Sequence, residues 1–272
     1  MFSIQVLYSA LERVRKCPEF QTNCFFLHPK LAALSQLEEA QIRISDGFVV
    51  LTYPERNFQR LYFWTANCQT IPAICRAAQD LLESDVMVMD LVGKAAVVQR
   101  GARYFEAQGM ERYALLSRYQ ATELHTVPEK AVRCTCSLVP AADVEKILPL
   151  LEEKLDPYVS HLPSVPYLYE LQKENLIYGC YVDEELVGVE ILEARGKWGR
   201  YFYQVAIKRT EQRKGLFTVL KNYTISHNAQ CTHWSTWIDD TNAGSIRGNE
   251  KAGMKKDGMK EMVFLLTDNR SL

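Results

Sequence analysis

The sequence lacks an excess of charge of either sign. Lysine and arginine total 32 against 33 aspartates and glutamates, which gives a formal net charge of -1 over 272 residues. Binding to nucleic acid or to an anionic membrane surface would need a basic face. An uninterrupted run of about 18 apolar residues, as a membrane-spanning helix requires, is also missing. We therefore expect a cytoplasmic protein with no nucleic-acid partner and no membrane partner.

Cysteine is present but lacks the spacing of a disulfide framework or a metal site. The eight cysteines are scattered over a long chain, which favours reduced thiols over the dense crosslinks of a small secreted domain. No CxxC or HxxxH motif occurs. Cys134 and Cys136 would share one face of a strand, but a metal ion would need two further ligands at suitable spacing. The sequence predicts no metal site.

The composition, with 47% hydrophobic and 24% charged residues, is typical of a folded globular chain. The length allows one large domain or two domains of about 130 residues each. A polar stretch at 123–130 that contains Pro128 separates two regions of periodic hydrophobicity. We place the domain boundary there, which gives domains 1–127 and 128–272.

The second half shows an orderly series of elements. Apolar alternation and helical spacing predict, in order, a strand at 132–138, a helix at 142–155, a short helix at 167–173, a hairpin of 176–182 and 186–192, and a strand at 201–207. A polar loop then leads into a helix that runs from Gly215 to about residue 229.

The start of that helix has the chemistry of an anion site. Its first backbone amides lack intrahelical partners and carry the positive end of the helix dipole. Gly215 lets the backbone approach a pyrophosphate, and Arg213 and Lys214 add positive charge beside it. The alternative is that Gly215 only eases the turn and that both basic side chains are solvated.

These segments, over residues 132–266, resemble the GNAT superfamily of N-acetyltransferases. The family's cofactor motif is Q/R-x-x-G-x-G/A, and the sequence has Gln212-Arg213-Lys214-Gly215-Leu216-Phe217. Phe217 stands where the family usually has a small residue. Its side chain could narrow the approach to the pyrophosphate, or it could pack inward and leave the amides available.

The downstream segments continue the resemblance. A strand at 232–238 precedes Asn242-Ala243-Gly244-Ser245 and the block at 250–254, which are similar to the family's N-x-x-A and Y-E-K-x-G-F blocks. The resemblance implies acetyl-CoA or another acyl-CoA as cofactor, no metal, and a cleft between strands that end at Ile207 and Ile238. It implies cofactor contacts from Val205, Ile207, Gln212, Arg213, Lys214, Gly215, Leu216, Phe217, Asn242 and Ser245. Asn242 also suits a helix cap.

The reaction that the resemblance implies is direct attack of a primary amine on the thioester through a tetrahedral intermediate. The general acid and base that many relatives use are absent, because Tyr201 occupies the position of the usual glutamate and Asn249 that of the usual tyrosine. Tyr201 and Tyr203 share a strand face and are candidates to hold a catalytic water, or are core residues.

The acceptor side offers weaker candidates. Asp239 and Asp240 could bind a cationic amine, or could start the turn into the next helix. His161 lies in a proline-punctuated loop at 156–166 and is a possible base, although a histidine in such a loop can equally be incidental.

The first half shows weak internal similarity to the second. Residues 103–110 align without gaps on residues 247–254 and share four of eight positions. A strand pair at 48–53 and 60–65, a helix at 72–82 and a strand at 86–91 follow the same order. The loop at 67–72, where a phosphate would bind, has neither glycine nor a basic residue. This predicts a degenerate GNAT-like domain without a cofactor; the alternative is an unrelated α+β domain.

Together these features predict an α+β fold of two GNAT-like domains, each with a mixed, mostly antiparallel central sheet flanked by helices. The function implied by the resemblance is transfer of an acetyl group from acetyl-CoA to a primary amine of a small molecule or peptide, by a monomer or a homodimer. The alternative is a GNAT-fold binding or regulatory protein that catalyses no transfer.

Overall fold

The computed structural model describes residues 4–19, 21–24, 39–129 and 131–267. Contacts divide the chain into two compact units: unit 1 comprises Met1–Leu116 and Gly258–Leu272, and unit 2 comprises Ser117–Asp257. The chain passes from one unit to the other within strand β6 (Glu111–Ala121) and returns within strand β12 (Lys255–Thr267). This grouping differs from a single division at residue 127, because the last strand joins the sheet of unit 1.

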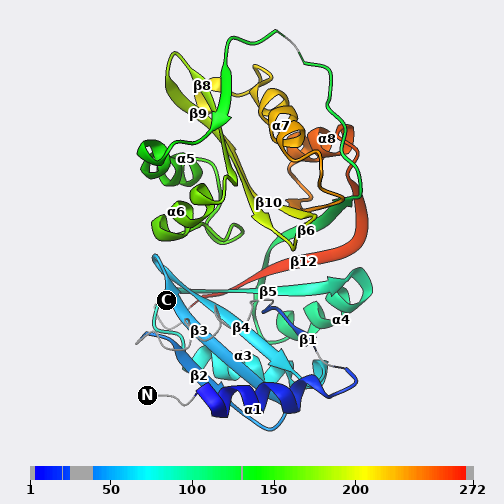
Figure 1. Cartoon of the computed structure of the whole chain (residues 1–272). Helices are drawn as coiled ribbons and strands as arrows, with labels where there is room; N and C mark the ends of the chain where they lie inside the picture. Colours follow the sequence, from blue (N-terminus) through cyan, green and yellow to red (C-terminus); the bar gives the residue numbers. More distant parts are fainter. Residues whose placement is uncertain (1–3, 20, 25–38, 130, 268–272) are drawn as a thin grey trace. The chain divides into compact units, whose positions relative to one another are not determined.

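Unit 1 contains the predicted strand pair and helix of the first half, with further elements around them (Figure 1). Its helices are α1 (Ile4–Arg15), the 3-10 turn η1 (Cys68–Thr70), α3 (Ile71–Asp80) and α4 (Ala95–Glu106). Its strands, besides parts of β6 and β12, are β1 (Gln21–Thr22), β2 (Gln41–Ile44), β3 (Phe48–Glu55), β4 (Phe58–Thr65) and β5 (Val86–Lys94). The strands predicted at 48–53, 60–65 and 86–91 and the helix at 72–82 are confirmed.

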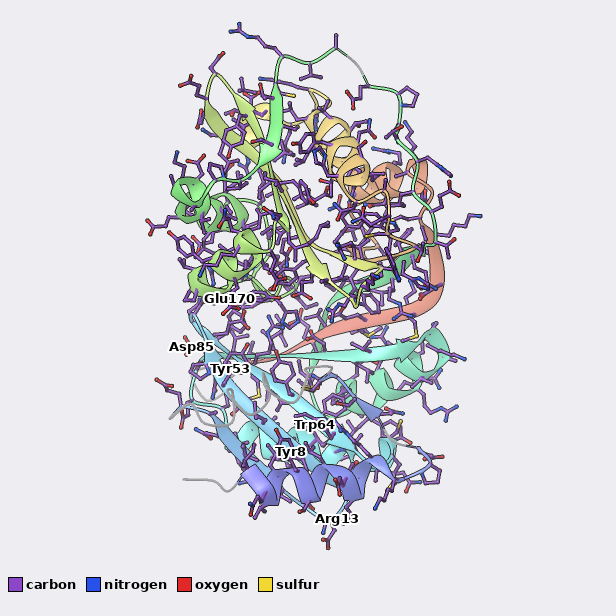
Figure 2. All side chains as sticks on the ribbon, in the orientation of Figure 1. Tyr8, Arg13, Tyr53, Trp64, Asp85 and Glu170 are labelled. Carbon is purple, nitrogen blue, oxygen red and sulfur yellow. The ribbon has the colours of Figure 1, made fainter. Side chains whose placement is uncertain are left out.

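The sheet of unit 1 has the order β2-β3-β4-β5-β12. All these neighbours are antiparallel except β4 and β5, which pair in parallel over three residues, Gln59 to Leu61 with Met87 to Met89. Helix α1 covers one face of the sheet through an apolar cluster that includes Leu11 and Trp64. Figure 2 shows Tyr8 and Trp64 where helix and strands meet.

Unit 2 begins within β6 and carries the elements predicted for the second half. Its helical elements are η2 (Ala141–Lys146), α5 (Ile147–Glu152), α6 (Val165–Lys173), η3 (Arg209–Glu211), α7 (Leu216–His227) and α8 (Ala243–Lys251). Its strands are β7 (Thr135–Leu138), β8 (Ile177–Val182), β9 (Glu185–Ala194), β10 (Gly199–Ile207) and β11 (His233–Asp239). The single helix predicted at 142–155 is instead a 3-10 turn followed by a short α-helix.

The sheet of unit 2 has the order β11-β10-β9-β8-β7. Its pairs are antiparallel except β10 and β11, which are parallel. Helices α5 and α6 lie on one face, and α7 and α8 lie on the other (Figure 1). One apolar core joins the layers, in which Leu151, Leu168, Ile191 and Leu220 are fully buried.

The two units share local geometry as well as strand order. Gly109 follows α4 with φ +81°, and Gly253 follows α8 with φ +104°. The next amide reaches back across the helix end in both cases, from Met110 to the Phe105 carbonyl at 3.2 Å and from Met254 to the Asn249 carbonyl at 3.0 Å. The structure thus confirms the predicted fold class, mixed and mostly antiparallel strands flanked by helices in each unit, and the aligned segments share their helix-end geometry.

Candidate functional site

The turn between β10 and α7 is built to leave backbone amides exposed. Gly215 caps α7 with φ +95°, a left-handed conformation that glycine adopts without the strain of a side chain. The first hydrogen bond of the helix runs from the Thr218 amide to the Gly215 carbonyl at 3.0 Å. Within the described ranges, nothing accepts from the amides of residues 214–217. These donors lie at the positive end of a twelve-residue helix.

The side chains around this turn take different roles. Gln212 donates from Nε2 to the Ile207 carbonyl at 3.4 Å, which closes the loop. Lys214 forms an ion pair with Glu211 at 2.9 Å. Arg213 is exposed and has φ +65°. Arg213 is therefore the basic side chain of this turn best able to meet an anion.

Strand β10 loses its pairing with β11 before it reaches this turn. They pair from Gly199 to Tyr201, opposite His233 to Ser235, and a bulge follows between Phe202 and Gln204. Beyond the bulge β10 continues to Ile207 in register with β9 only. The predicted divergence of the two strands is present, and a strand that has lost one neighbour offers main-chain groups to a ligand.

Phe217 packs inward. A methyl group added at Gly248 of α8 would lie 2.4 Å from the Phe217 ring, so the ring fills the space beside that glycine. The Lys221 ammonium lies 5.6 Å from the ring centroid on the core side. Of the two alternatives for this bulky residue, the geometry favours the one that leaves the amides of the turn accessible.

Asn242 and Ser245 form the start of α8. The Asn242 side chain accepts a hydrogen bond from the Ser245 amide at 3.0 Å, so its capping role is confirmed. Asn249 donates from Nδ2 to the Ser245 carbonyl at 2.9 Å. The Asn249 side chain is 3% exposed, and its Oδ1 has no partner among the described residues. A buried acceptor without a protein partner is a position at which a water or a ligand N–H group can bind.

This set of groups fits an acyl-CoA. A pyrophosphate suits the unpaired amides of the α7 turn with Arg213 beside them. The pantetheine arm carries amide N–H groups, which are donors of the type that Asn249 Oδ1 needs. The gap between β10 and β11 gives an extended arm main-chain partners.

A cluster of polar and aromatic residues is formed by β9, β10, α6 and the loop before α6. The Tyr201 and Tyr203 rings are 6.2 Å apart, as expected for residues on one strand face. Tyr203 donates from its hydroxyl to the His161 carbonyl. The ring of Tyr203 packs edge-on against Tyr167 at 6.3 Å.

Glu193 is the acidic member of this cluster, and the sequence analysis missed it. It lies on β9 directly opposite Tyr201. The Tyr167 hydroxyl donates to Glu193 Oε1 at 2.8 Å, and Arg195 pairs with Oε2 at 2.8 Å. Burial, followed by the charge of Glu193, raises the pKa of Tyr167 well above its usual value. Glu193 follows the end of the predicted strand, and only the register of β9 with β10, which the connection at 195–198 sets, could have placed it beside Tyr201.

The two aspartates have local partners. Asp239 Oδ1 accepts from the amide and the hydroxyl of Thr241, both at 2.7 Å, which is a turn-forming arrangement. Asp240 Oδ1 accepts from Lys256 Nζ at 3.2 Å. Of the two roles weighed for this pair, the geometry favours the structural one for Asp239.

The matching loop of unit 1 is arranged differently. Asn67 Oδ1 accepts from the Gln69 amide at 2.9 Å, and Pro72 near the start of α3 has no amide to donate.

No described helix in the chain is long and apolar enough to span a membrane.

Solved structures similar to this one include GNAT proteins. A tandem GNAT protein from the clavulanic acid biosynthesis pathway, solved without AcCoA, has a TM-score of 0.62 at 11% identity over 97% of this chain and 95% of its own. The GCN5-related N-acetyltransferase from Sphaerobacter thermophilus has a TM-score of 0.64 at 12% identity over 88% and 85%. A GNAT-family acetyltransferase from Colwellia psychrerythraea has a TM-score of 0.58 at 8% identity over 98% of both chains.

The chain has the tandem GNAT fold. This confirms the predicted fold and the predicted tandem arrangement, which cover both halves of the sequence. The sequence itself matches no family model and no curated protein.

Proposed function

We propose that unit 2 is an acyl-CoA-dependent N-acyltransferase that acetylates a primary amine. The observation that carries the proposal is the row of unpartnered amides at the α7 turn, placed where β10 and β11 separate. Gly215 and Arg213 would hold the pyrophosphate, and Asn249 Oδ1 would accept from the pantetheine arm. When bound, acyl-CoA supplies an acyl group activated as a thioester.

Glu193 would act as the general base. An amine must lose a proton before it can attack, and a carboxylate within hydrogen-bonding reach can accept that proton directly or through a water. Tyr167 and Arg195 hold both carboxylate oxygens, which fixes the orientation of Glu193. Tyr201 and Tyr203 would line the acceptor side and orient the amine or the water. This role for Glu193 takes the place of the glutamate that relatives carry at the position of Tyr201.

The binding step is tested by thermal unfolding of the full chain with acetyl-CoA. A ligand at 100 times its dissociation constant should add about 2.7 kcal/mol to stability. Arg213→Ala should weaken this effect, whereas Arg209→Ala, which removes a basic residue of η3 in the preceding loop, should leave it unchanged. Absence of a shift with acetyl-CoA and with longer acyl-CoAs would contradict the proposal.

The catalytic step is tested by following thiol release with a polyamine, an amino sugar and a peptide as acceptors. Glu193→Gln should lower kcat by about 100-fold or more and remove the ascending limb of the pH profile, since it keeps the shape but not the proton acceptor. Glu184→Gln, in the turn of the same hairpin, is the matched control. Normal pH dependence in Glu193→Gln would exclude Glu193 as the base.

A binding or regulatory role is the second candidate, and Asn249 favours it. Asn249 replaces the tyrosine that relatives use as general acid, and an amide side chain cannot supply a proton to a departing thiolate. Acetyl-CoA binding without thiol release across the three acceptor classes would support this candidate over catalysis.

A further inference from the structure

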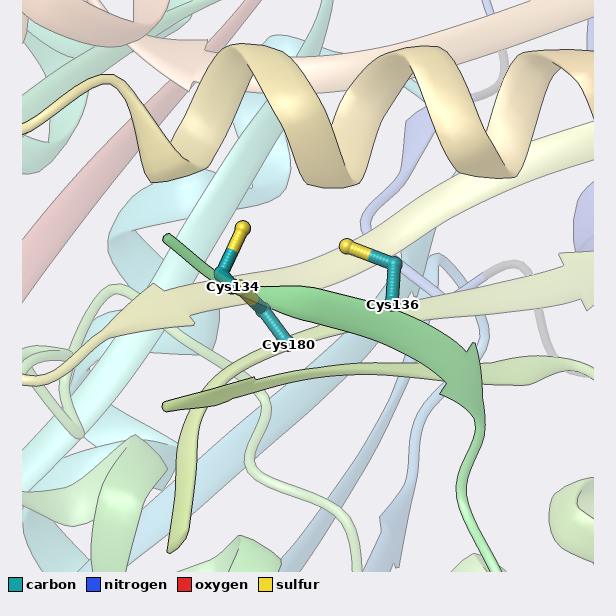
Figure 3. A group of neighbouring side chains, drawn as sticks. All are labelled: Cys134, Cys136 and Cys180. Atoms are coloured by element: carbon teal, nitrogen blue, oxygen red, sulfur yellow. The ribbon is translucent and has the colours of Figure 1, made fainter. Parts of the chain in front are cut away.

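Three cysteines of unit 2 converge although they are dispersed in the sequence. Cys136 of β7 lies directly opposite Cys180 of β8, and Cys134 lies two residues before Cys136. Their three sulfur atoms all lie within 4.8 Å of one another. Figure 3 shows the sulfurs of Cys134 and Cys136 on the side of β7 that faces a helix; this helix is α7, which packs on β7 and β8. The sequence offered only the first pair, because the third thiol depends on the register of β7 with β8.

The spacing of the three sulfur atoms suits ligands of one metal ion. Zinc–sulfur bonds of about 2.3 Å place tetrahedral thiolates about 3.8 Å apart, and the three sulfur atoms, all within 4.8 Å of one another, are close to that spacing. Cys180 is fully buried, whereas Cys134 and Cys136 are half-buried. The ion would therefore have an inner ligand and two outer ones, with access from outside.

That access is provided by a pocket of about 610 Å³ beside α7. Its lining includes Cys136, Glu129, Asn222, Tyr223 and Ser226. Three protein ligands with a fourth position open to a pocket is the arrangement of a zinc ion that keeps an exchangeable ligand.

The local charges favour a cation. Cys136 is the sulfur of the three that lines the pocket. Glu129, held by Asn222 Nδ2 at 2.7 Å, adds negative charge to the lining of the same pocket. The buried Lys221 ammonium is already engaged by Glu190 at 2.6 Å. No described cation pairs with the three thiols.

We propose that Cys134, Cys136 and Cys180 form a three-thiolate site for a divalent thiophilic ion of the zinc class, with the fourth coordination position facing the pocket. Thiolate ligands select such ions over magnesium or calcium. The bound ion would tie β7 to β8 beneath α7, and it would stabilise unit 2 because metal binding free energy adds to folding free energy. This site shares no residue with the acyl-CoA turn, so it does not depend on the proposed transferase activity.

The test uses the reduced, metal-free full chain. We expect one equivalent of Zn²⁺ to bind in competition with a chromophoric chelator, and Co²⁺ to give thiolate-to-metal charge-transfer absorption. Cys134→Ser and Cys136→Ser should each weaken Zn²⁺ binding more than about 100-fold, since losing a ligand exceeds the 10–100-fold cost of a second-shell change. Cys231→Ser, at a buried cysteine of the same unit outside the cluster, should bind normally.

The outcomes separate this site from its alternatives. Zn²⁺ should raise the unfolding temperature of the parent chain and not that of Cys134→Ser, which keeps the buried Cys180 and so should still fold. Equal Zn²⁺ binding in all variants, or Co²⁺ binding without charge-transfer absorption, would overturn the proposal. Binding of Cu⁺ but not of Zn²⁺ would overturn it as well. So would metal binding that persists after Cys136 and Cys180 have formed a disulfide.

Discussion

A buried group of charges in unit 1 illustrates what single residues determine. Arg60 is fully buried, and its guanidinium contacts Glu55 at 2.7 Å and Asp90 at 3.5 Å. Glu261 of β12 lies in the same group, and burial, followed by the charge of Asp90, raises its pKa to about 8, although Arg60 acts in the opposite direction. The carboxyl of Glu261 is therefore neutral in the folded chain at mildly acidic pH.

The raised pKa predicts how stability depends on pH. The folded state holds a proton on Glu261 more tightly than the unfolded state, so the free energy of unfolding should fall as pH rises from about 4.5 to about 8. Glu261→Gln should reduce this fall by about 1 kcal/mol or more, measured by urea unfolding at pH 5 and pH 8. Glu12→Gln, on the exposed side of α1, is the control. An unchanged pH dependence in Glu261→Gln would contradict this assignment.

At the scale of elements, the contact between α7 and α8 can be tested by one added methyl group. Gly248→Ala would force the new carbon against the Phe217 ring, which lies 2.4 Å from its position. We expect a loss of about 1–3 kcal/mol in urea unfolding, as for other overpacked sites. Phe217→Ala in the same chain should recover part of this loss, because the two residues share one space. Additive losses in the double variant would show that the ring is not the obstacle.

Local sequence patterns predicted most helices and strands of unit 2. They did not predict the side-chain contacts that depend on the register between neighbouring strands. The hairpin of β8 and β9 follows from alternating side chains around a short turn, and the strand-to-helix turn follows from Gly215. The proximity of Glu193 to Tyr201, and of Cys180 to Cys136, is instead set by which residues face each other across strands. A one-residue slip would reverse both relations, and no local pattern fixes the register that closely.

The course of β12 could not be predicted for a related reason. The sequence analysis placed these residues in the second domain without assigning them a strand, yet residues 259–267 pair along β5 of unit 1, where Val263 and Phe264 are fully buried. Apolar alternation identifies a strand but does not name the sheet that receives it. Sequence order alone therefore assigned 258–272 to the second domain.

At the scale of the whole molecule, the two units differ in one loop. This loop joins β4 to α3 in unit 1 and β10 to α7 in unit 2. Unit 2 leaves the amides of its turn unpartnered, whereas unit 1 caps its own turn with Asn67 and places Pro72 in the first helical turn. The two units do share the cap geometry at Gly109 and Gly253. Retention of an anion site should therefore distinguish the two units.

This difference predicts one acetyl-CoA per chain, bound by unit 2. Titration calorimetry should give a stoichiometry of one, and hydrogen exchange should slow at residues 213–217 and 242–249 on addition of acetyl-CoA. The loop at 67–72 should exchange at its original rate, because its Gln69 amide is already bonded and Pro72 has none. Arg213→Glu should abolish the protection in unit 2 without creating any in unit 1. Two equivalents per chain, or protection at 67–72, would mean that unit 1 has kept a cofactor site built from other groups.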